Sequence, residues 1–210
     1  MTLYINGHGF KYELENLIKM FFPLIRVEVV YDSEVNEVDD ENNIVTTRDV
    51  QEAVTLLSVV VECQGKIGTD EEEIDNNTAD YESECERLFA VMLYRLLEQM
   101  TDVHPKWGIL TGIRPVKLVE DRVKQGKSRE QIVKEFSDDL LVAPEKTELL
   151  LQIEEVQRPV VRSLRPKGYS LYIAVPFCPT RCHYCSFVSH SVENAQKLIP
   201  EYLDRLCEEL

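Results

Sequence analysis

Three of the six cysteines in this 210-residue chain lie close together near its C-terminal end, as Cys178, Cys182 and Cys185. Thiolates are the ligands that suit iron–sulfur clusters and zinc, and three of them in one loop can reach a single centre. A [4Fe–4S] cluster held by only three cysteines has one iron without a protein ligand. An open position of this kind accepts a substrate or cofactor, as the open position of a catalytic zinc does. The spacing therefore predicts a metal centre that takes part in chemistry.

Zinc is the main alternative to an iron–sulfur cluster in this loop. The fourth zinc ligand would be His183, but it directly follows Cys182, which makes chelation of one ion by both residues awkward. A disulfide would leave one odd thiol, and nothing else in the sequence indicates an oxidising compartment. Inert cysteines are usually scattered through a core, whereas these three stand together between prolines and aromatic residues. We therefore favour the cluster and keep a zinc-stapled interaction module as an alternative.

The composition is that of a soluble globular protein, with 44% hydrophobic and 29% charged residues, and a cluster of reduced thiols is consistent with the cytoplasm as its expected compartment. No apolar run reaches the roughly 18 residues of a membrane span, and the N-terminus shows no signal-peptide pattern. The net charge of −15 is uneven, because residues 1–100 hold 22 acids and 7 bases, whereas residues 101–168 hold 11 and 13. An acidic surface repels phosphate backbones, so we expect no nucleic-acid partner.

Residues 1–100 predict a small α+β sheet layer. We expect strands at 3–5, 25–31, 55–63 and 66–68, the last two joined as a hairpin, with helices at 12–21 and 81–100. The acidic stretches 32–49 and 70–80 read as surface loops, and His8, between two glycines, as an exposed turn residue. Cys63 is expected beside the sheet and Cys85 on the apolar stripe of the second helix, both as packing residues.

Residues 101–165 predict a helical part that begins with a distinctive loop, from His104 through the only tryptophan, Trp107, to Lys117. Helices are expected at 114–124, from a capping box at Ser128 onward, and at 144–162. Arg114 and Lys117 are suited to holding a carboxylate together. We prefer the plainer interpretation that they are surface residues at the end of a helix packed by Trp107.

The turn at 165–168 marks a domain boundary, so we expect domains at 1–165 and 166–210. Tyr169–Val175 is short, β-branched and aromatic, and it ends at Pro176, which predicts a strand. The cysteine loop follows, and then a helix over 191–210. The fold class is α/β, with the α+β extension preceding a strand–loop–helix unit.

At the cysteine loop the chain resembles the coproporphyrinogen oxidase-like branch of the radical S-adenosylmethionine (SAM) enzymes. The resemblance rests on Tyr172 to Cys178, on the C-x3-C-x2-C spacing that continues to Phe187, and on the Trp107–Lys117 stretch. The second stretch is similar to that of HemZ-type oxygen-independent coproporphyrinogen dehydrogenases. The family implies that Cys178, Cys182 and Cys185 bind a [4Fe–4S] cluster, and that Tyr172 and Tyr184 lie beside bound SAM. It also implies that the strand–loop–helix unit is the first βα unit of a radical SAM TIM-like partial barrel.

The resemblance implies oxidative decarboxylation of coproporphyrinogen III to protoporphyrinogen IX in haem biosynthesis, started by a radical derived from SAM. The expected partners are a tetrapyrrole substrate and an electron donor such as a flavodoxin or ferredoxin. Bacterial oxidases of the family carry a further cysteine two residues after the third, where this chain has Phe187. Haem-trafficking relatives also lack it, so a haem-binding chaperone is an alternative function. Because most strands of the barrel are missing, we expect residues 1–210 alone to be inactive.

Overall fold

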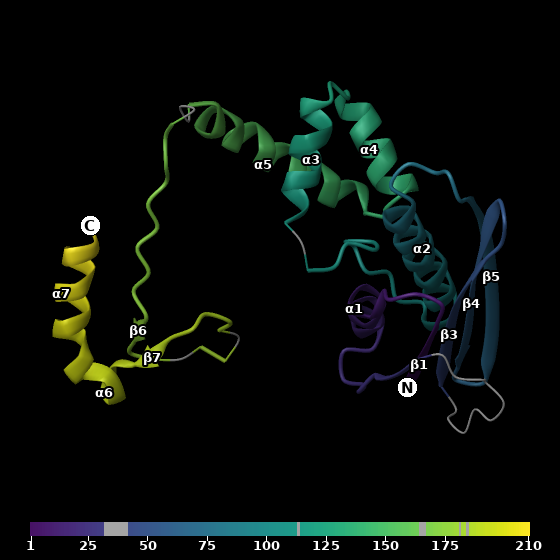
Figure 1. The fold of residues 1–210 in the computed structure, drawn as a ribbon, viewed down its shortest axis with the longest axis horizontal. Coiled ribbons are helices and arrows are strands. Elements are labelled where there is room, and N and C mark those ends of the chain that lie inside the picture. The colour runs from purple at the N-terminus through teal and green to yellow at the C-terminus, as the bar shows by residue number, and fades with distance from the viewer. Residues whose placement is uncertain (32–41, 113, 164–166, 181, 184) are drawn as a thin grey trace. The chain divides into compact units, whose positions relative to one another are not determined.

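A computed structural model describes residues 1–31, 42–112, 114–163, 167–180, 182–183 and 185–210. The protein is of the mixed α/β type and divides into two compact units, Met1–Arg162 and Ser163–Leu210 (Figure 1). None of the helices in the described part of the chain is long and apolar enough to cross a membrane.

The first unit is built on a mixed sheet with the strand order β2-β1-β3-β4-β5. The strands are β1 (Thr2–Asn6), β2 (Glu28–Tyr31), β3 (Asn43–Val50), β4 (Val54–Cys63) and β5 (Lys66–Asp75). Helix α1 (Lys11–Phe21) connects the parallel pair β1 and β2, as a parallel connection requires. Strand β3 runs parallel to β1, and β4 runs antiparallel to both of its neighbours, β3 and β5. The predicted hairpin is confirmed: Gln64 and Gly65 both have positive φ, as in the type I′ turns that match the twist of a β-ribbon.

Strand β4 shows why the sheet needs a helical cover. Its alternate residues Thr55, Leu57, Val59, Val61 and Cys63 are buried, and the residues between them are only partly covered. Helix α2 (Tyr81–Thr101) packs against β4 and β5, and α1 packs against α2, so the two helices cover one face of the sheet. The packing roles predicted for two cysteines are confirmed, since Cys63 and Cys85 both belong to this core.

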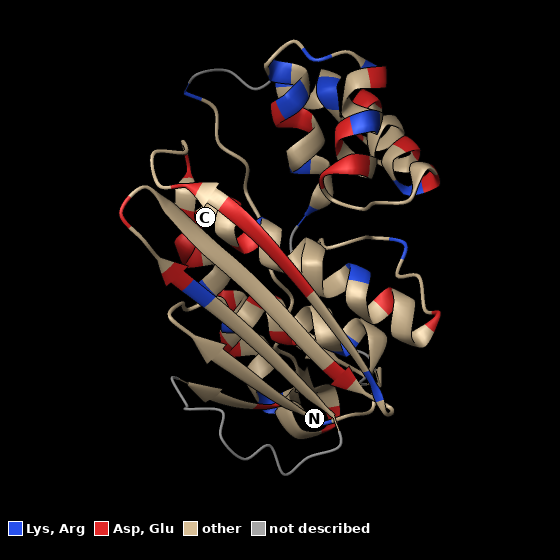
Figure 2. Ribbon diagram, turned by 90° about the vertical axis from the view of Figure 1, so that its right-hand side faces the viewer, with Lys and Arg blue, Asp and Glu red and all other residues tan. Residues whose placement is uncertain are grey.

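Two loop predictions in this unit are wrong. Within 32–49, the described part from Asn43 onward is strand β3, held by β1 on one side and β4 on the other; residues 32–41 lie outside the described residues. Within 70–80, the acidic residues up to Asp75 continue β5, because β4 offers ten residues for pairing. The acidic residues of β5 are red in Figure 2, and most of them are exposed; charged side chains are a common protection for the edge of a sheet. A local charge pattern could not reveal these pairing partners.

Three helices complete the first unit. They are α3 (Pro115–Lys124), α4 (Arg129–Asp138) and α5 (Pro144–Ser163), close to their predicted bounds. The capping box is confirmed, with the Ser128 hydroxyl accepting from the Gln131 N–H and the Gln131 side chain accepting from the Ser128 N–H. Their small core contains Val119, Ile132, Phe136, Val142, Leu150 and Leu151, and Trp107 packs against it.

The second unit contains little regular structure before its helices. Two-residue strands β6 (Phe177–Cys178) and β7 (His190–Ser191) pair in parallel, and the chain then forms α6 (Val192–Ala195), η1 (Gln196–Leu198) and α7 (Ile199–Glu209). The predicted helix over 191–210 is therefore present in three consecutive pieces.

The strand predicted at Tyr169–Val175 is absent. This segment is extended, but no described strand lies beside it, and Tyr169, Tyr172 and Val175 are 87%, 82% and 72% exposed. A strand is defined by hydrogen bonds to a neighbour, so residues with high β-propensity do not form one where no partner is present.

Candidate metal centre

The three clustered cysteines lie on one loop of the second unit, at different depths. Cys178 ends β6 and is half-buried, Cys182 is exposed, and Cys185 is half-buried. Short local contacts shape the loop: the Cys178 thiol donates to the Thr180 carbonyl at 2.7 Å, and the Cys185 N–H donates to the Cys182 carbonyl at 3.0 Å. The three thiols are therefore carried by one short piece of chain and kept out of the hydrophobic core.

The two ends of this loop are held together. Phe177 pairs with His190 and Cys178 with Ser191, and the His190 N–H donates to the Pro176 carbonyl at 2.8 Å. Because β6 and β7 are parallel, the loop between them must bring the chain back from the end of β6 to the start of β7. The cysteine loop is thus closed at its base by backbone hydrogen bonds, although β6 and β7 contain only two residues each.

Helix α7 also holds the segment that leads into the loop. The hydroxyl of Tyr202 donates to the Ala174 carbonyl, and its ring packs edge-on against Phe177, with ring centroids 5.3 Å apart at 79°. Tyr202 therefore connects α7 to Ala174 and Phe177, in the segment that leads into the loop. Sequence reasoning predicted a helix over this position but missed the role of Tyr202, because no local pattern shows which segment a helix contacts.

The three thiols have the chemistry and the solvent access that the predicted cluster requires. All six cysteines of the chain are free thiols, and the three in the loop are none of them fully buried. Their thiolates are the ligand type that iron–sulfur clusters take. Their positions are those of separate thiols, however: among the described residues, no group of three His, Cys, Asp or Glu side chains converges on a common metal position. The same holds for a zinc site that would add His183.

The two residues expected beside SAM differ in what the structure says of them. Tyr172 lies in the extended segment six residues before Cys178, and its side chain is 82% exposed. Tyr184 lies outside the described residues. Both roles therefore remain predictions.

A cavity of about 370 Å³ adjoins the first cysteine. It is formed where the chain leaves the loop through β7 and enters α6, and the residues that line it are Cys178, Ser189, His190, Ser191, Asn194, Ala195 and Leu198. The lining includes the polar residues Ser189, His190, Ser191 and Asn194 and the apolar residues Ala195 and Leu198. Polar groups of this kind, close to a thiol, are suited to orienting a polar ligand at the loop.

Two of the remaining cysteines, Cys63 and Cys85, are poorly suited to binding a metal. Burial raises the pKa of the Cys63 and Cys85 thiols, which disfavours the thiolate that a metal needs. Cys207 is exposed on α7.

The second predicted site, at Arg114 and Lys117, agrees with the plainer interpretation. Both residues are exposed at the start of α3, and Trp107 packs with Val116 and Leu118 against the helical core. The Lys146 ammonium lies 5.1 Å from the centre of the Trp107 ring, so this aromatic side chain has a structural partner of its own.

Comparison with known proteins gives one informative similarity. A stretch of 110 residues, 51% of this chain, is 40% identical to the oxygen-independent coproporphyrinogen-III oxidase-like protein HemZ of Bacillus subtilis. The match covers 22% of that protein, so this chain corresponds to about a fifth of the length of its relative. No family model matches the chain.

Among solved structures, protein VC0702 from Vibrio cholerae is similar over 47% of this chain and 75% of its own, with 15% identity and a TM-score of 0.27.

Proposed function

We propose that this chain carries the cysteine loop of a radical SAM protein and serves the oxygen-independent oxidative decarboxylation of coproporphyrinogen III to protoporphyrinogen IX. The observation that carries the proposal is the set of three free, accessible thiols of Cys178, Cys182 and Cys185 on one loop closed at its base by β6 and β7. The similarity to a coproporphyrinogen-III oxidase-like protein supports the choice of reaction.

In this proposal the three thiolates hold a [4Fe–4S] cluster, and Tyr172 and Tyr184 lie beside SAM. When bound, the cluster supplies the electron that cleaves SAM and so starts the removal of hydrogen from a propionate side chain. The chain's own contribution is positional. Tyr202 and the β6–β7 pair fix the base of the loop, and the groups around Cys178 are suited to orienting a polar ligand.

The wider arrangement follows from the same proposal. The second unit would be the first βα unit of a TIM-like partial barrel, in which Tyr169–Val175 gains the neighbouring strands that it lacks here. A tetrapyrrole would be the substrate, a flavodoxin or ferredoxin the electron donor, and the cytoplasm the compartment. Residues 1–210 alone are not expected to turn over, because the chain matches only a fifth of its relative.

The test begins with anaerobic reconstitution of residues 1–210 with iron and sulfide, followed by visible and EPR spectra with and without SAM. We expect a brown protein with three cysteine ligands whose reduced EPR signal changes on addition of SAM. A colourless protein that holds one tightly bound zinc ion would overturn the proposal. A cluster that ignores SAM in this chain requires the same measurement on the full-length protein, where an unchanged signal would also reject it.

A haem-binding chaperone is the second candidate, favoured by Phe187, which stands where bacterial oxidases of the family carry a further cysteine. Its side chain is 74% exposed, and a phenyl ring has no atom that could bind iron in place of the missing thiolate. Product analysis of the full-length protein separates the two functions. Release of CO₂ and formation of vinyl groups identifies the oxidase, whereas stoichiometric binding and transfer of intact haem identifies the chaperone.

A further inference from the structure

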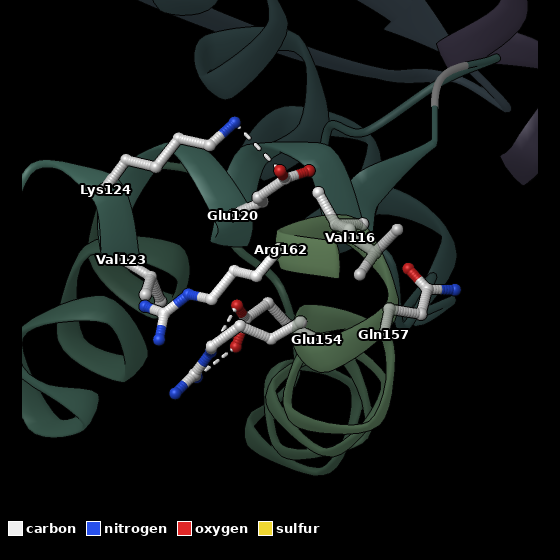
Figure 3. A pocket seen from close by; sticks show the side chains of 9 residues that line it. Val116, Glu120, Val123, Lys124, Glu154, Gln157 and Arg162 are labelled. Atoms are coloured by element: carbon white, nitrogen blue, oxygen red, sulfur yellow. Dashed lines mark hydrogen bonds and ion pairs between the residues drawn. The ribbon is translucent and has the colours of Figure 1, made fainter. Parts of the chain in front are cut away.

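A groove between α3 and α5 lies within the first unit and is independent of the cysteine loop. It has a volume of about 100 Å³, and Figure 3 shows side chains from both helices turned toward it. The residues that line it are Val116, Glu120, Val123, Lys124, Glu154, Gln157, Arg158, Val161 and Arg162. An engineered cavity of about 150 Å³ holds benzene, so a space of this size is suited to a chain of about four to six carbons.

The floor of the groove is apolar. Val116 and Val123 of α3 are half-buried and face Val161 of α5, which is 45% exposed. Three branched side chains around a small hollow leave apolar surface in contact with water, and covering that surface with an aliphatic chain is favourable.

Most charges around the groove are already neutralised within it. Glu154, only 4% exposed, accepts from Nε of Arg158 at 2.8 Å and from a second nitrogen of the same guanidinium. Lys124 pairs with Glu120 at 2.8 Å, one turn earlier on α3, and lies 3.9 Å from Asp121. Two of the three cations that line the groove therefore have acidic partners.

Arg162 is the cation that remains. Within the described part of the chain it makes no hydrogen bond or ion pair, although its charge helps to hold the pKa of Glu154 low. Figure 3 shows its side chain crossing from α5 toward Val123 of α3, with its guanidinium at the edge of the apolar floor. The groove thus combines an apolar floor with one uncompensated positive charge. A guanidinium in this position is geometrically suited to a carboxylate, which it can bind through two parallel hydrogen bonds.

We propose that the α3/α5 groove binds a small amphiphilic carboxylate, an unbranched aliphatic acid whose carboxylate pairs with Arg162 and whose chain lies on Val116, Val123 and Val161. A cationic amphiphile is disfavoured by the same lining, because its head group would meet Arg162, and the nearby acids already have partners. The proposal concerns the first unit only, so the outcome of the cluster experiments does not affect it.

The test is a titration of the ¹⁵N-labelled 210-residue chain with sodium hexanoate, followed through the backbone amide shifts of α3 and α5. We expect saturable shifts confined to these helices, with a dissociation constant on the order of 1 mM for a ligand of this size. Acetate, which lacks the chain, and hexylamine, which reverses the charge, should both bind at least about tenfold more weakly.

Two variants and one control make the assignment specific. Arg162→Gln should weaken hexanoate binding about tenfold by removing the charged donor. Val123→Thr should weaken it by placing a hydroxyl in the floor with little change in shape. Arg26→Gln, which removes an exposed arginine elsewhere in the unit, should leave binding unchanged. The absence of saturable shifts at α3 and α5, equal binding of hexylamine, or unchanged affinity in Arg162→Gln would each overturn the proposal.

Discussion

The backbone of Gly108 lies directly against that of Leu140. A Cβ atom at Gly108 would stand 2.0 Å from the Leu140 carbonyl oxygen, and Gly108 itself has a φ of +58°. The neighbouring Ile109 N–H donates to the same Leu140 oxygen at 3.0 Å, and the Ala143 N–H donates to the Lys106 carbonyl at 3.0 Å. This contact fixes the loop around Trp107 to the turn between α4 and α5, which accounts for the glycine in that distinctive stretch.

Replacing Gly108 by alanine should therefore be strongly destabilising. The positive φ alone costs about 1 kcal/mol for a residue with a Cβ, and displacing the Leu140 carbonyl should raise the total to about 3 kcal/mol or more. Gly126→Ala is the matched control, because Gly126 has a φ of +80° but no atom within 4 Å of its added Cβ, so only the first cost applies. Urea unfolding followed by circular dichroism measures both values. Equal losses of stability in the two variants would show that the close approach is unimportant.

The elements that the sequence predicted well are those defined by local signals. Helices α1 to α5 follow from apolar periodicity, the proline at the start of α3 and the capping box at Ser128, and the β4–β5 hairpin follows from its turn. Strand β3 was missed because its β-branched residues, Ile44 to Thr47, directly follow an acidic run that resembles a loop. The second half of β5 was missed because its acidic sequence forms a strand only through pairing with β4. The strand predicted at Tyr169–Val175 is absent because its β-prone sequence has no neighbouring described strand with which to pair.

His8 shows the same limit at the level of one residue. Its position between glycines indicated an exposed turn, but its ring stacks on Phe89 of α2 at 4.4 Å, and its Nε2 lies 3.0 Å from the Thr46 hydroxyl. The candidate centre divides similarly. The spacing of the three cysteines is visible in the sequence, whereas the contacts of Tyr202 with Ala174 and Phe177 are visible only in the structure.

Arg158→Gln should destabilise the first unit in a pH-dependent manner. The hydrogen bonds from Arg158 lower the pKa of the buried Glu154 carboxyl below its ordinary value of 4.5. The stabilisation that the Glu154–Arg158 pair gives the folded state is therefore complete well above pH 4.5. It is lost as the pH falls through the lowered pKa of Glu154 in the folded protein.

At neutral pH the variant should unfold at a lower urea concentration than wild type, because a charged hydrogen bond is removed and a buried carboxylate loses its partner, while the partial exposure of Arg158 limits the effect. The difference from wild type should narrow as the pH is lowered from about 7 to about 3. Urea unfolding across this range measures it, with Arg205→Gln as the control for loss of an exposed ion pair. A difference that stays constant or widens toward acid pH would contradict this account of Glu154.

The six thiols should separate into two classes of reactivity. In the folded apoprotein, Ellman's reagent should react rapidly with Cys178, Cys182, Cys185 and Cys207, which are exposed or half-buried. Cys63 and Cys85 should react slowly, since burial both blocks access and raises the pKa of their thiols. In denaturant all six should react quickly. After reconstitution with iron and sulfide, only Cys207 should remain fast. A reconstituted protein in which all four accessible thiols still react rapidly would argue against ligation by the loop.

Tyr202→Leu should impair the cysteine loop while leaving the first unit intact. The change removes both the hydrogen bond to Ala174 and the edge-on contact with Phe177, so the chain entering the loop loses its attachment to α7. We expect Tyr202→Leu to bind less iron and sulfide per chain on reconstitution, and its three loop thiols to react faster with Ellman's reagent. Tyr202→Phe keeps the ring contact and should lie between Tyr202→Leu and wild type. Tyr169→Phe, which alters an 87% exposed side chain, serves as the control. If wild type forms a cluster and Tyr202→Leu forms it equally well, with unchanged thiol rates, the loop is positioned without help from α7.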